Sequence, residues 1–374
     1  MQIDFHHGVT YVVARLAGFV PPEADIIAHS AQYVDDATES GEIWFANGML
    51  YPRISSAHKM FDYRNARKLA NHRVWLPFHF LPGNRGEAAP DAPLPFTSED
   101  DFILRCVCRP NSHPARELMR IVITRQERDY ALYRLGIAAH VFVDTWAHQG
   151  FVGYQHRINI ATDIVANDEH HEKRFDKRAE EFFKSGWGRF LSWLLGEALP
   201  LGHGTVLSYP DRPYLTWSYT NGLGERVGRD NPTDFLEAAK NLYMHFRRYI
   251  DFKEDGEGVF GKLYEIPAHF ETLGNRLKTV KDEEGDDRHR AWLKMAADGT
   301  FGFKDQVSYV QKGEGSWKHQ ALGTLEDIGQ NSRRPLAYPP RFLTSHWKHF
   351  HDALQAHRFC VLNELLPRYG ILSG

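Results

Sequence analysis

The segment GIAAHVFVDTWAHQGF, residues 136–151, places two histidines and an aspartate at intervals of four among apolar and aromatic neighbours. On a helix, His140, Asp144 and His148 would share one face, because four residues turn about 400° and rise about 6 Å. Imidazole and carboxylate groups are typical ligands of Zn²⁺. We predict that His140 and Asp144 bind one metal ion, that Asp144 and His148 bind another, and that Asp144 is the bridge. The competing interpretation is a polar helix face with hydrogen-bonded histidines.

Ligands from one helix cannot complete a metal site, so other segments must contribute. Several segments combine histidine with a nearby carboxylate in apolar surroundings, although each histidine has a capping or core role as its alternative. In a strand, Asp4 and His6 would share a face, whereas in a helix they would diverge. His79 is a further histidine among apolar residues. The candidate ligands outside the central helix are Asp4, His6, His29, Asp36, His58, His203 and Asp211.

The segment LPLGHGTVLSYPDRPYLTW, residues 199–217, could close such a site. The glycines on either side of His203 permit close backbone approach, and the turn at Tyr209–Pro213 projects Asp211 and Arg212. A guanidinium next to a metal ligand suits a phosphate group, whereas ordinary turn chemistry is the alternative explanation. Arg212 is therefore a candidate catalytic residue, and Arg53 and Lys59 are further candidate phosphate contacts.

Composition limits the class of protein. Of 374 residues, 21 are histidine, more than twice the roughly one in 45 expected from average usage. The 45 basic and 48 acidic residues nearly cancel, so the charge gives no reason to expect a nucleic-acid or membrane partner. Three cysteines do not form a disulfide framework, and neither a signal peptide nor a span of membrane length is visible. We expect a cytoplasmic protein.

Helical periodicity recurs along the chain, whereas alternating strand patterns are scarce. Helices are predicted over 21–39, from 112, and over 126–150, 168–196, 233–251, 284–297 and 342–366. Long loops are predicted over 83–101, 251–261, 273–285 and 311–340. The predicted fold is mostly α, a multi-helix bundle with long loops and a metal cluster in its interior. It is expected to form one domain over 1–374, with a C-terminal helical subdomain over 252–374 as an option.

The segment LGIAAHVFVDTWAHQGF resembles the signature of the zinc-dependent phospholipase C superfamily, which includes single-strand-specific nucleases and heterokaryon-incompatibility proteins. The interval of four between Asp144 and His148 is closer to the incompatibility-protein branch. The segments DFHHGVTYVVARLAGF, AHSAQYVDDA, ANHRVWLPFHFLPGN and GHGTVLSYPDRPYLTW are also similar to an uncharacterised bacterial family.

The resemblance implies a helical bundle with a three-metal cluster. It supports His140, Asp144 and His148 as ligands. The superfamily's earlier Asp and His pair has its counterpart in Asp35 or Asp36 followed by His58. Its later His and carboxylate pair is replaced by His203 with Asp211. The superfamily's metal-binding N-terminal Trp is absent, and Asp4 or His6 would take its place.

The predicted chemistry is hydrolysis of a small phosphoester by a metal-activated water, with Asp35 or Asp62 as general base. Two or three Zn²⁺ ions are expected, and iron or manganese are alternatives. A di-iron oxygenase is the second hypothesis, although the usual Glu-x-x-His pair is missing. The third hypothesis is a non-catalytic helical scaffold that bound metal stabilises, with the histidine-rich stretch 344–351 as its surface for a partner. For that stretch, however, the favoured interpretation is an amphipathic helix whose histidines are solvated. Lipid and nucleic-acid substrates and the oligomeric state stay open.

Overall fold

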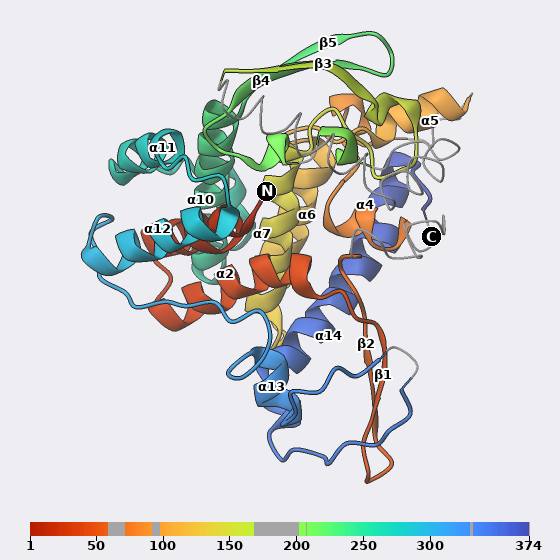
Figure 1. The fold of residues 1–374 in the computed structure, drawn as a ribbon, viewed down its shortest axis with the longest axis vertical. Coiled ribbons are helices and arrows are strands. Elements are labelled where there is room, and N and C mark those ends of the chain that lie inside the picture. The colour runs from red at the N-terminus through yellow and green to blue at the C-terminus, as the bar shows by residue number, and fades with distance from the viewer. Residues whose placement is uncertain (59–71, 92–97, 168–201, 207, 330–331, 374) are drawn as a thin grey trace, which may run out of the picture.

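The computed structural model describes residues 1–374 except 59–71, 92–97, 168–201, 207, 330–331 and 374. The described chain is mostly α-helical, as predicted, with two small sheets at its periphery (Figure 1). Its α-helices are α1 (Thr10–Ala17), α2 (Pro21–Asp36), α4 (Trp75–Phe78), α5 (Glu99–Cys106), α6 (His113–Thr124), α7 (Ala131–Ala147), α10 (Asn231–Asp255), α11 (His269–Thr279), α12 (Gly285–Asp298), α13 (Trp317–Leu322) and α14 (His346–Phe359). Two π-helical segments, Asp4–Val9 and Cys360–Leu365, adjoin α1 and α14.

Both sheets are antiparallel. The strands β1 (Gly41–Trp44) and β2 (Leu50–Arg53) form a hairpin that projects beside α14 (Figure 1). The other sheet has the order β3-β4-β5, with β3 (Ala161–Ala166), β4 (Thr216–Asn221) and β5 (Arg226–Asp230). Its inward residues, including Trp217 and Tyr219, pack with Phe151 and Tyr209 just beyond the end of α7.

Helix α7 is the centre of the fold. Its residues from Tyr133 to Ala147 are all buried, which agrees with its apolar sequence. Helices α2, α6, α10 and α14 pack against it (Figure 1). Gly136 allows α2 to approach closely, because a Cβ atom at this position would lie 2.3 Å from the carbonyl oxygen of Ile27. This contact brings the C-terminal end of α2 beside the histidines of α7.

Most predicted helices are present within one turn or two of their expected ends. Two helices lie where loops were predicted: α11 overlaps 273–285, and α13 falls inside 311–340. The segment 168–196 lies outside the described residues. In α14, Trp347 and Phe350 are buried, as the predicted amphipathic helix requires, but His351 is only 3% exposed and therefore is not solvated.

Residues on both sides of position 252 share the principal core, which extends from Met1 to Ile371. Helix α10 continues through residue 252, α12 packs on the π-helix Asp4–Val9, and α14 packs on α7. The number of domains stays a prediction. None of the helices that the structure describes combines the length and the apolar character needed to cross a membrane.

Candidate metal centre

The predicted stripe of α7 forms a buried cluster. The carboxylate of Asp144 lies 3.2 Å from Nε2 of His140 and 3.6 Å from Nδ1 of His148, measured from Oδ2. All three side chains are at most 5% exposed. Helical spacing alone accounts for this arrangement, because the three residues are successive members of one i, i+4 series. Gly150, with a φ of 86°, follows the end of the helix just beyond His148.

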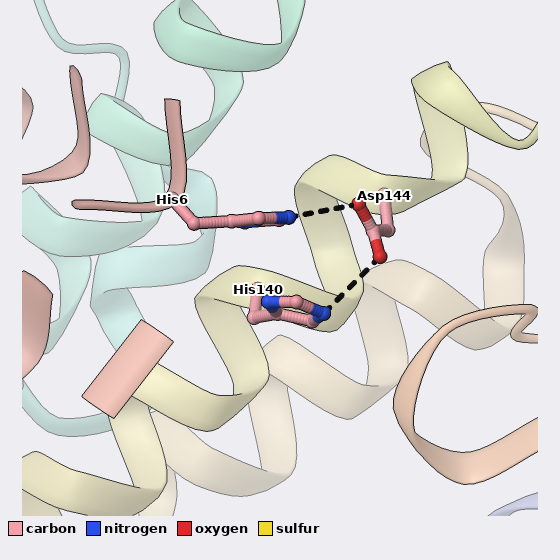
Figure 2. Close-up of side chains that lie close together, drawn as sticks. All are labelled: His6, His140 and Asp144. Carbon is pink, nitrogen blue, oxygen red and sulfur yellow. Dashed lines mark ion pairs between the residues drawn. The ribbon is translucent and has the colours of Figure 1, made fainter. Parts of the chain in front are cut away.

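His6 joins the cluster from the start of the chain. Its Nε2 lies 3.2 Å from Oδ1 of Asp144, and its ring stacks on that of His140 with centroids 3.8 Å apart (Figure 2). The residue belongs to neither a strand nor an α-helix but to the π-helix Asp4–Val9, all of which is buried. His6, His140 and Asp144 form the first group, whose ligand atoms all lie within 4.8 Å of one another.

Asp35 and His79 form the second group together with His140. Oδ1 of Asp35 lies 3.8 Å from both Nδ1 of His79 and Nε2 of His140, and these two nitrogens are 3.3 Å apart. Asp35 is the last but one residue of α2, and His79 directly follows α4. Its apolar neighbours Phe78 and Phe80 distinguish His79 in the sequence, but the sequence pattern predicts His58 as the ligand from this part of the chain. The sequence pattern predicts Asp35 as a candidate general base, and the resemblance offers it as an alternative to Asp36 for a ligand.

The third group consists of His148, His203 and Asp211. Nε2 of His203 lies 4.0 Å from Oδ2 of Asp211. Phe80 stacks on the ring of His148 with centroids 4.4 Å apart, and so limits its orientation. Asp211 ends the short 3-10 turn Tyr209–Asp211, whose backbone accepts a hydrogen bond from Nδ2 of Asn231. The three groups are contiguous, since the first two share His140 and Oδ2 of Asp144 lies 3.6 Å from Nδ1 of His148 in the third.

Backbone carbonyls fix which imidazole nitrogens carry hydrogen. Nδ1 of His140 donates to the carbonyl of Ala31 at 2.8 Å, and Nε2 of His79 donates to that of Ser56 at 2.9 Å. A carbonyl only accepts, and a neutral imidazole has one N–H, so the other nitrogens of both rings present lone pairs. These two lone pairs face each other across 3.3 Å. Two acceptors cannot hydrogen-bond, whereas a shared cation would satisfy both.

Burial favours the neutral form of three histidines in the cluster. It is the main cause that lowers the pKa of His6, His140 and His148 below the ordinary value. Burial alone would raise the pKa of Asp144, but His148 and the other surrounding nitrogens together hold this pKa well below its usual range. Asp144 is thus an anion among neutral imidazoles, the protonation states that bind a divalent cation.

A cationic group already lies against these carboxylates. The amino group of Met1 is 2.6 Å from Oδ1 of Asp144 and 3.3 Å from Oδ1 of Asp211. Burial lowers its pKa, but Asp144, Asp211 and Asp35 outweigh burial and raise the pKa to about 11. The interior of the cluster therefore favours positive charge.

The donor spacing fits bound metal. Two ligands at about 2.0–2.1 Å from a tetrahedral ion are about 3.4 Å apart. The separations of the donor atoms in the three groups, 3.2–4.0 Å where they are given above, lie close to this value. Nitrogen and carboxylate donors are also the ligand types that divalent transition metals prefer. The residues present therefore fit such ions.

Other predicted site residues lie elsewhere. Asp4 pairs with Arg288, with its Oδ2 2.6 Å from Nε. His29 stacks on Trp317, and Asp36 accepts hydrogen bonds from Gln32, Tyr309 and Gln311. The structure places Asp4, His29 and Asp36 in none of the three groups. His58 is also outside them and is buried near Trp75. The two candidate phosphate contacts in the described chain pair with carboxylates, Arg53 with Glu39 and Arg212 with Glu283. Lys59 and Asp62 lie outside the described residues.

The fold and the cluster define a mostly helical protein with a buried histidine and aspartate centre suited to divalent metal. Over residues 1–365 the chain matches the family model described as "Family of unknown function (DUF6765)", and it belongs to that family. Neither a curated protein nor a solved structure matches the chain.

Proposed function

We propose that this protein is a metal-dependent phosphoester hydrolase whose centre binds two or three metal ions within the three groups. Nε2 of His140, the nitrogen of this ring that is free to bind metal, serves either the first group or the second. The observation that carries the proposal is the pair of lone pairs on His79 and His140, which face each other beside two carboxylates. Such an arrangement is unfavourable without a cation between the donors. In this proposal the helices around α7 form the bundle that encloses the cluster.

The donor set favours zinc. The three groups contain five histidines, three aspartates and no glutamate within the described chain. Di-iron carboxylate sites use a glutamate from each of two helices and a Glu-x-x-His motif from each of two others. A centre richer in imidazole than in carboxylate is typical of Zn²⁺, with iron or manganese as the alternatives. The donor set thus argues against the di-iron oxygenase hypothesis.

Two ligands of the cluster are partly exposed, which favours catalysis over a purely structural role. The side chains of His140 and Asp144 are at most 1% exposed, but those of Asp35 and His203 are 32% and 20% exposed. Within the described chain no group offers more than three protein ligands, and a catalytic zinc with three protein ligands keeps a fourth position for water or substrate. A small phosphoester would enter over Asp35 and His203.

Bound zinc would polarise a phosphoryl oxygen and lower the pKa of a water, so that hydrolysis needs no protein nucleophile. The protein's part is positioning. Asp144 holds its anionic charge between His6 and His140, and the carbonyls of Ala31 and Ser56 fix the orientation of the rings. Phosphate binding by Arg212 would require its 3.4 Å contact with Glu283 to open. The phosphoester class itself rests on the resemblance of residues 135–151 to the zinc-dependent phospholipase C superfamily.

The test combines metal analysis with an activity panel. Purified wild-type protein is analysed for zinc, iron and manganese, then assayed on bis(p-nitrophenyl) phosphate, p-nitrophenylphosphorylcholine and a single-stranded oligonucleotide. Asp144→Asn keeps the shape of the side chain but removes its charge. The matched control is Asp305→Asn, which breaks the ion pair with Arg15 and leaves the three groups intact.

We expect about two or three zinc ions for each wild-type chain, hydrolysis of at least one substrate, and loss of both metal and activity in Asp144→Asn only. Metal-free wild-type protein, or equal metal content in both variants, would refute the metal centre. Tightly bound metal without hydrolysis of any phosphoester would instead support the non-catalytic scaffold that metal stabilises.

A further inference from the structure

One face of α12 contacts the π-helix that carries His6. Nε of Arg288 lies 2.6 Å from Oδ2 of Asp4, and the next residue, His289, shares a 2.9 Å hydrogen bond with His7. Asp4 and His7 thus face α12, whereas His6 faces Asp144. The π-helix is flanked on both sides of His6 by contacts with a single neighbouring helix.

Trp292, one helical turn beyond Arg288, completes this face. It packs against Gly8 so closely that a Cβ atom on the glycine would lie 2.7 Å from the Cβ of the tryptophan. Both Arg288 and Trp292 are at most 1% exposed. The contact face Arg288–His289–Trp292 therefore fixes the position of the π-helix along its axis and its rotation about that axis, through an ion pair, a hydrogen bond and steric contact.

Arg288 also connects the start of the chain to the loop before α12. Its Nη2 donates to Oε1 of Gln2 at 2.6 Å, and its Nη1 donates to the carbonyls of Asp282 and Glu283 at 2.7 and 2.8 Å. With the bond to Asp4, this guanidinium contacts four acceptors from two segments. A lysine ammonium has no planar fork and cannot reproduce this set of bonds.

The same loop reaches the third metal-ligand group. The carboxylate of Glu283 lies 3.4 Å from Nη2 of Arg212, the residue that follows Asp211. The contacts from Asp4 through Arg288 and Glu283 to Arg212 are continuous. They link the segment that carries His6 to the turn that carries Asp211.

We propose that Arg288 is a positioning residue of the metal centre, which it serves by holding His6 in the first group and supporting the turn of Asp211. The inference rests on the proposed metal centre. Removal of a residue that orients a metal ligand typically weakens metal affinity about 10- to 100-fold. An effect of that size is expected here for the ions bound by His6 and Asp211.

The test uses the full chain and three single substitutions. Arg288→Lys keeps the charge but loses most of the bonds, and Asp4→Asn weakens the same ion pair from the other side. Arg15→Lys is the matched control, because Arg15 also forms a 2.6 Å ion pair with an aspartate, but its partners Asp305 and Phe19 belong to neither the π-helix nor the loop before α12. Zinc affinity is measured by competition with a chromophoric chelator, the coordination by the visible spectrum after Co²⁺ substitution, and folding by circular dichroism.

We expect a 10- to 100-fold loss of zinc affinity and an altered Co²⁺ spectrum in Arg288→Lys and Asp4→Asn, with wild-type values in Arg15→Lys. If Arg288→Lys does not fold, the zinc affinity and the Co²⁺ spectrum of Asp4→Asn alone test the inference. Wild-type affinity and spectrum in folded variants would overturn the inference, and so would an equal loss in Arg15→Lys. Metal-free wild-type protein would overturn the proposed function as well, so the two failures are distinguishable.

Discussion

Gly8 provides a direct test of the packing between the π-helix and α12. A Cβ atom at this position would lie 2.7 Å from Cβ and 3.2 Å from Cγ of Trp292. The shorter distance is about 0.7 Å less than ordinary van der Waals contact at roughly 3.4 Å, so the substitution Gly8→Ala must push the two helices apart. The indole cannot simply turn away, because it is buried and stacks on Phe301 with an interplanar angle of 8°.

Overpacking of this kind typically costs about 1–3 kcal/mol, and the better helix propensity of alanine offsets up to about 1 kcal/mol. We therefore expect Gly8→Ala to lower the free energy of unfolding by up to about 2 kcal/mol, even when the helix propensity of alanine offsets its full share. The displacement also moves His6, two residues earlier, away from Asp144, so zinc affinity should fall in the same variant.

The assay is urea unfolding followed by circular dichroism, together with zinc competition on the same samples. Gly258→Ala is the control, since its Cβ would meet no atom within 4 Å. Its free energy of unfolding should stay within about 0.5 kcal/mol of the wild-type value. If Gly8→Ala matched the control in both stability and zinc affinity, the π-helix would not be held by α12 as we argue.

Three further predictions concern stability and the ligand set. Burial lowers the pKa of His245 and His357 to about 3, below the ordinary value of 6.5 that histidine has in the unfolded chain. The unfolded chain therefore binds more protons between about pH 3 and 6.5, and stability should rise with pH across this window by up to about 1.4 kcal/mol per pH unit for each histidine. Urea unfolding of the double glutamine variant should show a flatter pH dependence; an unchanged slope would contradict the assignment. Arg229 donates to the last carbonyls of α7 at 2.8 and 3.1 Å, so Arg229→Met should lower the free energy of unfolding by at least about 2 kcal/mol, and a wild-type urea midpoint would exclude this role. Elemental analysis should find less metal per chain in His79→Ala than in the wild type, and an unchanged metal content in His29→Ala. The reverse result would mean that His29 is the ligand and His79 is not.

Local sequence patterns were sufficient for the helices and for the central stripe. The mostly apolar sequence of α7 predicted its burial, and the interval of four placed His140, Asp144 and His148 on one face, because both properties depend only on helix periodicity. Helix α11 was missed because its sequence, HFETLGNRLKT, is polar and contains a glycine. It is helical because one apolar side, including Phe270 and Leu273, packs into the principal core.

Which distant residues meet the stripe was decided by tertiary packing. The sequence offered both His58 and His79, and both lie in apolar surroundings, but only His79 adjoins the stripe in the described chain. Asp4 and His6 are also equivalent candidate ligands in the sequence. In the structure, the π-helix directs Asp4 toward Arg288 and His6 toward Asp144. A ligand set depends on the relative placement of segments far apart in the chain, and neither spacing nor residue type along a single segment contains that information.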